Sequence, residues 1–251
     1  ADEAAPGRDG ATAAQPDIHP FSGEARAKNA SAIANGEPGF NAIVGTAGSE
    51  AVGVELLQRL SRGDVMALAE LGFAVGKDFD PRTREWGLGR WEGKYIVVAG
   101  EGHAVDWRPL EGVEPLAHSH PLDLGRQLHH GNRRIDLEKI TANSGDRMLA
   151  SLVFSSPDDI AFLVQRRQAS HTVVIPYEHL GGTEVILATP GASKRPPITI
   201  EIIGAAPLGA HGIPPTLRYG ADVVVKAGGQ PIWRGTVDAV YPPGGKPHLE
   251  F

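Results

Sequence analysis

The chain has 251 residues, a formal net charge of −6 and no cysteine. Its length suffices for one large domain with its own core, and it contains no apolar run long enough for a transmembrane helix, so we expect no membrane partner. The lack of cysteine excludes disulfides, cysteine-based zinc knuckles and the zinc nucleobase deaminases, and the negative charge argues against a nucleic-acid partner.

The N-terminal segment, residues 1–45, is rich in Ala, Gly, Pro, Asn and Asp and lacks apolar periodicity. This composition predicts an irregular, flexible arm or linker. The first residues contain neither an initial Met nor the charged-then-apolar pattern of a signal peptide. We therefore expect the chain to be one domain of a longer protein.

The clearest helix pattern covers residues 49–63. Ser49 is suited to cap its N-terminus, and Val52, Leu56 and Leu60 recur at helical spacing. A second, shorter helix is expected over residues 64–71. After residue 84 the pattern becomes that of β-strands, which are expected at residues 85–91, 94–99, 105–107 and 114–118, with a hairpin turn at Glu92-Gly93.

The second half of the chain follows a polar stretch, residues 122–152, in which we expect a short helix at residues 137–140. Ser156 and Pro157 are typical of the start of another helix. Strands are expected at residues 152–154, 171–176, 184–188, 198–203, 217–226 and 231–241. The strands after the Pro-rich break at residues 194–197 are interpreted as a small all-β appendage.

Two histidines in the segment His118-Ser119-His120-Pro121 lie at the end of an expected strand. Residues i and i+2 of a strand face the same side, so the two imidazoles can bind one metal ion from adjacent positions. Because the chain has ten histidines, the pair is also compatible with two surface histidines at a strand end. A catalytic zinc site needs a third protein ligand and leaves its fourth position to water.

The segment Ser156-Pro157-Asp158-Asp159 places two carboxylates at the start of the expected helix. The helix dipole favours an anion in the first turn. Asp159 is therefore a candidate for the third ligand. Both aspartates are also compatible with a purely stabilising role at the helix N-terminus.

The combination of His118-x-His120 with Ser156-x-x-Asp159 resembles the motif of the JAMM (JAB1/MPN/Mov34) zinc metalloproteases. That motif has an upstream Glu, then His-x-His-Pro, then Ser-x-x-Asp. The resemblance implies that His118, His120 and Asp159 bind one Zn²⁺. It also implies that Ser156 helps to stabilise the tetrahedral intermediate.

The same resemblance implies that an upstream Glu is the general base. The family places this Glu just before an apolar strand that contains glycine. Glu85 has this context, because Trp86-Gly87-Leu88-Gly89 follows it. Glu92 is the competing candidate, but it lies at the expected hairpin turn.

The resemblance covers roughly residues 80–190 and implies an α/β fold, with a mixed central β-sheet flanked by helices, for residues 46–195. Residues 196–251 would form a β-rich C-terminal extension. Unlike compact family members, the chain has 35 residues between His120 and Ser156. The long insertion, residues 122–152, resembles that of the JAB-like domains of bacterial polymorphic toxins and injected effectors.

Four further histidines are not assigned by the motif: His103, His129, His130 and His171. Each could line the cleft, and each is also compatible with a position on the surface or in the core. His129 and His130 lie in the insertion, which must leave and return at the metal site, so these two are also candidates for shaping substrate entry.

From these residues we expect a metalloprotease or isopeptidase that hydrolyses an amide bond of a protein or peptide substrate with a metal-activated water. The resemblance further implies a toxin or effector domain, secreted or injected from a bacterium, with a cognate immunity protein or a delivery particle as partner. One alternative is a non-catalytic JAB-like binding or structural module. Another is a different metal-dependent hydrolase, such as a phosphoesterase or nuclease, although such sites usually need more carboxylates.

Overall fold

The computed structural model describes residues 22–35, 42–102, 104–121, 128–130, 133–135, 156–176, 182–188, 198–201 and 216–250. The helices are α1 (Gly23–Asn35), α2 (Glu50–Ser61), α3 (Met66–Glu70), α5 (Pro157–Gln165) and a short 3-10 helix, η1 (Pro81–Thr83). The strands are β1 (Ala42–Ala47), β2 (Trp86–Trp91), β3 (Lys94–Ala99), β4 (Glu114–Ser119), β5 (Leu128–His130), β6 (Arg133–Ile135), β7 (Ser170–Ile175), β8 (Thr183–Ala188), β9 (Ile198–Glu201), β10 (Thr216–Ala227), β11 (Gln230–Tyr241) and β12 (His248–Glu250). None of the helices in the described residues has the length and apolar character that crossing a bilayer requires.

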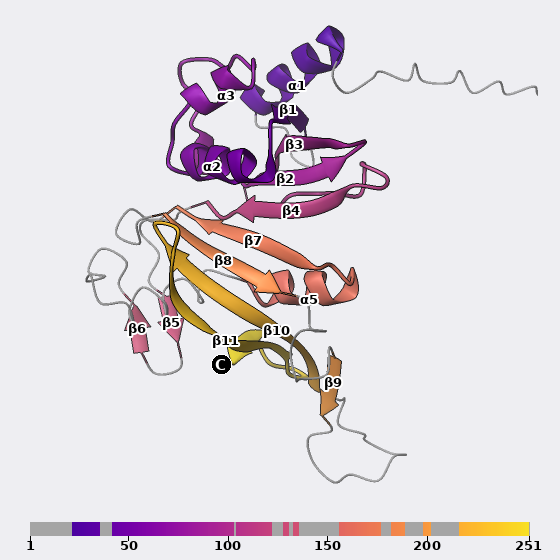
Figure 1. Cartoon of the computed structure of the whole chain (residues 1–251), viewed down its shortest axis with the longest axis vertical. Coiled ribbons are helices and arrows are strands. Elements are labelled where there is room, and N and C mark those ends of the chain that lie inside the picture. Colours follow the sequence, from indigo (N-terminus) through magenta and orange to yellow (C-terminus); the bar gives the residue numbers. More distant parts are fainter. Residues whose placement is uncertain are drawn as a thin grey trace, which may run out of the picture.

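Ten strands form one sheet, in which the neighbours follow the order β1-β3-β2-β4-β7-β8-β10-β11-β12 and β9 pairs with β10 (Figure 1). The contact between β4 and β7 is parallel, whereas the other neighbouring pairs are antiparallel. β5 and β6 form a separate two-stranded sheet. The predicted α/β class with a mixed central sheet is therefore confirmed.

The hairpin between β2 and β3 turns at Glu92 and Gly93, as predicted, with φ angles of 49° and 74°. Positive φ at both central residues is the geometry of a two-residue hairpin turn that matches the strand twist. Glu85 precedes the other end of β2. At about 3.3 Å per residue, Glu85 and Glu92 are roughly 20 Å apart along the strand.

Helices cover both faces of the sheet. The apolar side chains of α2, Leu57 among them, pack against β2 and against Val174 of β7. Those of α5, including Leu163, pack against Val173 of β7 and against β8, β10 and β11. Because successive residues of a strand point to opposite faces, α2 and α5 lie on opposite sides of the sheet.

We expected the N-terminal segment to be an irregular arm, but part of it forms regular secondary structure. Within residues 1–45, α1 is a helix and β1 begins. The side-chain amide of Asn29 donates to the carbonyl oxygen of Ile43 at 3.1 Å, and Ile33 is buried. The prediction is wrong for these residues because α1 carries few large apolar side chains, and its sequence therefore shows no apolar periodicity. The helix is stabilised by its packing against the rest of the domain. The remaining residues of the predicted arm lie outside the described ones.

The C-terminal strands belong to the central sheet and do not form a separate appendage. β10 pairs with β8 from Asp222 opposite Ala188 to Ala227 opposite Thr183, and β11 and β12 continue the sheet. Buried side chains of β10 and β11 share one core with α5. The predicted separation of residues 196–251 is therefore wrong, because alternation along a strand reveals its two faces but not its partner strand.

The predicted insertion, residues 122–152, is described only at β5 and β6. These two strands pair antiparallel, and β5 includes the backbone of His129 and His130. The helix expected at residues 137–140 and the strand expected at residues 152–154 lie outside the described residues.

The strand expected at residues 105–107 is not formed. Trp107 instead packs its indole into a core cluster with Ile96 and Val98, which lie on β3. A Cβ at Gly87 would lie 2.7 Å from the Trp107 ring, so the glycine is what allows this ring to rest on β2. The histidine at position 103 lies outside the described residues.

Gly100 follows β3 at a close approach of two backbone segments. A Cβ built there would overlap the carbonyl oxygen of Ala104 and lie 3.0 Å from that of Glu85. Backbone atoms cannot rotate away as the end of a side chain can. We expect Gly100→Ala to lower the free energy of unfolding by about 1–3 kcal/mol, as measured by urea denaturation.

Gly48 offers a matched control, because it follows β1 and a Cβ there would have no neighbour within 4 Å. Gly48→Ala should not lower the free energy of unfolding. If the two alanine variants are equally stable, the close approach at Gly100 does not constrain the fold.

Candidate metal centre

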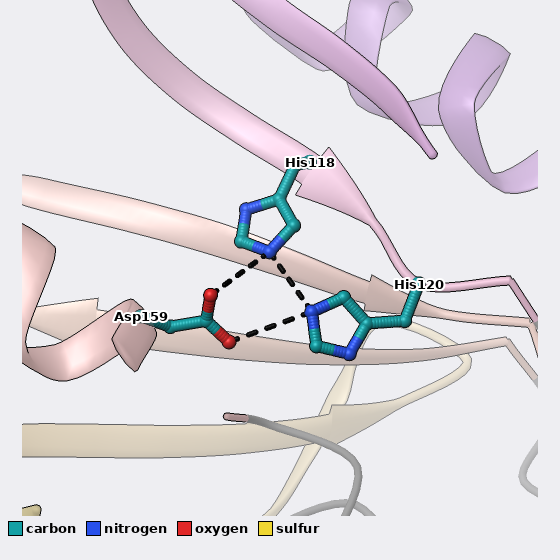
Figure 2. Close-up of side chains that lie close together, drawn as sticks. All are labelled: His118, His120 and Asp159. Carbon is teal, nitrogen blue, oxygen red and sulfur yellow. Dashed lines mark hydrogen bonds and ion pairs between the residues drawn. The ribbon is translucent and has the colours of Figure 1, made fainter. Parts of the chain in front are cut away.

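The two histidines of the His-Ser-His-Pro segment lie at the C-terminal end of β4, which runs between β2 and β7. The backbone N–H of His120 donates to the carbonyl oxygen of Val174 at 3.0 Å. Ser119 lies between the histidines, and its hydroxyl accepts a hydrogen bond from the backbone N–H of Trp86 at 3.0 Å. The imidazoles of His118 and His120 approach each other, with 3.0 Å between their Nε2 atoms (Figure 2).

Asp159 reaches the same point from the first turn of α5. The backbone N–H of Ser156 donates to Asp159 Oδ2 at 2.8 Å, and the Ser156 hydroxyl accepts from the backbone N–H of Asp158 at 3.1 Å. This reciprocal arrangement is a capping box. It satisfies donors at the helix N-terminus and fixes the Asp159 carboxylate in one orientation.

The three side chains provide a donor set that fits one zinc ion. Asp159 Oδ1 lies 3.2 Å from His118 Nε2, and Asp159 Oδ2 lies 3.5 Å from His120 Nε2 (Figure 2). In a tetrahedral site with metal–ligand distances of about 2.0–2.1 Å, neighbouring ligand atoms are about 3.3–3.4 Å apart. The side chains are 11%, 15% and 13% exposed for His118, His120 and Asp159. The site is therefore shielded from bulk water but still reachable.

Asp159 carries its charge in this environment. Burial is the largest influence and by itself would raise the pKa of the carboxyl group. The charges and hydrogen bonds of His118 and then His120 outweigh burial and hold the pKa of Asp159 well below its usual range. An ionised carboxylate beside two imidazole nitrogens attracts a cation to this point.

His171 is a residue of this site that the motif does not assign. It lies on β7, is 2% exposed, and its Nε2 is 2.6 Å from His118 Nδ1. Burial, followed by the neighbouring His118, lowers the pKa of His171 to about 3, so its imidazole is neutral near pH 7. The sequence predicts a strand at this position and makes His171 one of four histidines that could line the cleft. The proximity depends on the parallel pairing of β4 with β7, a contact that local periodicity does not reveal.

Glu85 lies at the same end of the sheet as the histidines. Gly87 of β2 pairs with His118 in an antiparallel register, so Glu85, two residues before Gly87, lies at the end of the sheet where β4 leads into His120. The Glu85 residue is buried, at 7% exposure. Glu92, the competing candidate, is exposed in the turn at the opposite end of β2.

Asp158, next to the candidate ligand, is held away from the histidine pair by the C-terminal hairpin. Its Oδ1 accepts a hydrogen bond from the phenol of Tyr241 at 2.6 Å. Burial and this hydrogen bond raise the pKa of Tyr241, so the phenol keeps its proton and continues to donate. The last residue of β11 therefore anchors the start of α5, which carries Asp159.

Ser156 and Ser49 cap two helices in the same way. The Ser156 hydroxyl accepts from the backbone of Asp158, and that of Ser49 accepts from the backbone of Val52 at 3.2 Å. We expect Ser156→Ala and Ser49→Ala each to lower the free energy of unfolding by about 0.5–2 kcal/mol in chemical denaturation. Wild-type stability of either variant would show that its hydroxyl does not act as a cap.

Comparisons of this chain with protein-family models, with curated proteins and with solved structures found no match. What the site can do is therefore inferred from the identity and geometry of its residues. Two imidazole nitrogens and one carboxylate, brought together from two separate elements, could hold one metal ion.

Proposed function

We propose that this chain is a zinc-dependent metalloprotease or isopeptidase of the JAMM type. The observation that supports it most is the convergence of His118, His120 and Asp159, whose ligand atoms lie within 4.8 Å of one another. The two histidines end a central strand, whereas the aspartate begins a helix far along the chain. Three such ligands leave one position of a tetrahedral zinc ion for a reactant.

The roles of the chain's own side chains follow from their positions. A zinc ion held by His118, His120 and Asp159 supplies Lewis-acid chemistry, which acidifies water and polarises a carbonyl group. Glu85 accepts a proton from the attacking water and returns it to the leaving amine as the C–N bond breaks. The hydroxyl of Ser156 accepts from a backbone N–H, which leaves its own hydrogen free to donate to the substrate carbonyl oxygen.

A single metal distinguishes this proposal from a phosphoesterase or nuclease. Those enzymes commonly use two metal ions about 3.5–4 Å apart, bridged by additional carboxylates. Among the described residues, the grouping suited to a metal consists of two histidines and one aspartate. The net charge of −6 also repels a polyanionic substrate. A protein or peptide substrate is therefore proposed.

The cellular setting is part of the same proposal. A long segment between the second histidine and the Ser-x-x-Asp motif is a property that this chain shares with JAB-like domains of bacterial toxins and injected effectors. We infer an effector domain of a larger bacterial protein, secreted or injected, whose activity an immunity protein or a delivery particle would control.

The test combines metal analysis with peptide hydrolysis. Purified protein should contain about one zinc ion per chain by mass spectrometry of the metal, the stoichiometry of one three-ligand site. It should also cleave members of a library of quenched fluorescent peptides and isopeptides. A chelator should stop the cleavage, and added zinc should restore it. Protein that binds zinc but cleaves nothing in the library or in cell lysate would instead be a binding module.

A further inference from the structure

His171 is buried behind His118 in the candidate metal centre. Its ring contacts two aromatic rings, with its centroid 4.9 Å from that of His118 and 6.1 Å from that of Phe162. One ring nitrogen, Nε2, faces His118 Nδ1 at 2.6 Å, and the other, Nδ1, lies 3.4 Å from the carbonyl oxygen of Pro115. Among the described residues, each ring nitrogen of His171 therefore has one polar neighbour.

A neutral imidazole has one N–H donor and one acceptor nitrogen, so these contacts restrict where the protons lie. The Pro115 carbonyl can only accept, which places the His171 proton on Nδ1. His171 Nε2 must then accept, and the proton between the two rings belongs to His118 Nδ1. The other nitrogen of His118, Nε2, points at His120 and Asp159 and is therefore the one available to bind a metal.

The opposite arrangement would disable the site. If His171 carried its proton on Nε2, it would donate to His118 Nδ1 and leave the Pro115 carbonyl without that donor. His118 would then carry its own proton on Nε2, directed at the point where the ligand atoms converge. An imidazole nitrogen that carries a proton has no lone pair for a metal.

We propose that His171 is a positioning residue that fixes His118 as the tautomer and ring orientation able to bind a metal through Nε2. This inference rests on the proposed metal centre and adds to it a residue that contacts a metal ligand and not the metal itself. Ligating histidines usually pass their other N–H to a carboxylate, a carbonyl or water. A neutral imidazole in this place orients His118 without adding a second buried negative charge, which would be costly at 2% exposure.

Two substitutions at position 171 separate the hydrogen bond from ring packing. His171→Phe fills the space but offers no acceptor. His171→Gln carries a carbonyl oxygen that can reach the position of Nε2 and accept from His118. Phe162→Leu is the matched control, because it loosens the packing on the same ring and leaves the His171–His118 contact in place.

The measurement is zinc affinity by competition with a chromophoric chelator, together with the tautomer of His118 from long-range ¹H–¹⁵N NMR of the wild-type protein. Wild type should show His118 protonated on Nδ1 in both zinc-free and zinc-loaded protein. His171→Phe should weaken zinc binding by about 10- to 100-fold, the usual cost of losing an outer-shell partner. His171→Gln should recover most of that loss, and Phe162→Leu should bind as wild type does.

The outcomes distinguish this inference from the proposed function. Wild-type protein that binds no zinc overturns the metal centre itself. Zinc-binding wild type with equal affinity in His171→Phe, or with no proton on His118 Nδ1 in the zinc-free state, overturns the role of His171 alone. Should the phenylalanine variant fail to fold, as judged by circular dichroism, the wild-type NMR measurement still decides.

Discussion

Asp159→Asn is expected to reduce zinc affinity by more than the roughly 10–100-fold that loss of an outer-shell partner costs. The substitution replaces an ionised ligand by a neutral amide, which is a poor ligand for Zn²⁺. The fold should survive, because the Asn oxygen can still accept the hydrogen bond that the Ser156 backbone now donates to Asp159. Loss of zinc would thus report the loss of a ligand and not of structure.

Asp158→Asn is the control for that experiment. Asp158 is the adjacent residue on the same turn, but its carboxylate accepts from Tyr241 and its side chain is directed to β11. This variant should bind zinc as tightly as wild type, with at most a modest loss of stability. Stoichiometric zinc in Asp159→Asn, or loss of zinc in Asp158→Asn only, would show that the assignment of the third ligand is wrong.

Glu85→Gln is expected to lower kcat by about 10²- to 10⁴-fold, the usual contribution of a positioned general base. The amide has nearly the same shape but cannot accept the proton of the attacking water. Glu85 is not one of the three grouped ligands, so the zinc content should stay at the wild-type level. Cleavage of a peptide identified with wild-type protein, followed at saturating substrate, measures the effect.

Glu92→Gln provides the comparison at the other end of β2. Glu92 is exposed in a hairpin turn, remote from the histidine pair, so its substitution should leave kcat unchanged. If Glu92→Gln is inactive and Glu85→Gln is active, the base assignment must be exchanged. If both cleave at the wild-type rate, neither glutamate is the base.

Local chemistry allowed the sequence to predict much of what surrounds the site. The Glu92-Gly93 turn, the Ser49 cap and the Ser156-Pro157 helix start each depend on a few adjacent residues, and each is present. Because residues two apart on a strand face the same side, the spacing of His118 and His120 predicted that their side chains point the same way. Their imidazoles do approach each other.

Contacts between distant segments could not be predicted in this way. α1 is stabilised by its packing on the rest of the domain, with few large apolar side chains to signal it. The pairing of β10 with β8 joins strands whose sequences reveal their faces but not their neighbours. His171 was only one of several unassigned histidines, and its place behind His118 follows from the parallel contact of β4 with β7.

The most direct test of the metal centre is anomalous diffraction at the zinc absorption edge from crystals of the zinc-loaded protein. A single strong peak is expected, bounded by His118 Nε2, His120 Nε2 and an Asp159 oxygen, with Glu85 alongside. A zinc peak held by other residues, or no peak between these three side chains in crystals grown with zinc, would contradict the proposed centre.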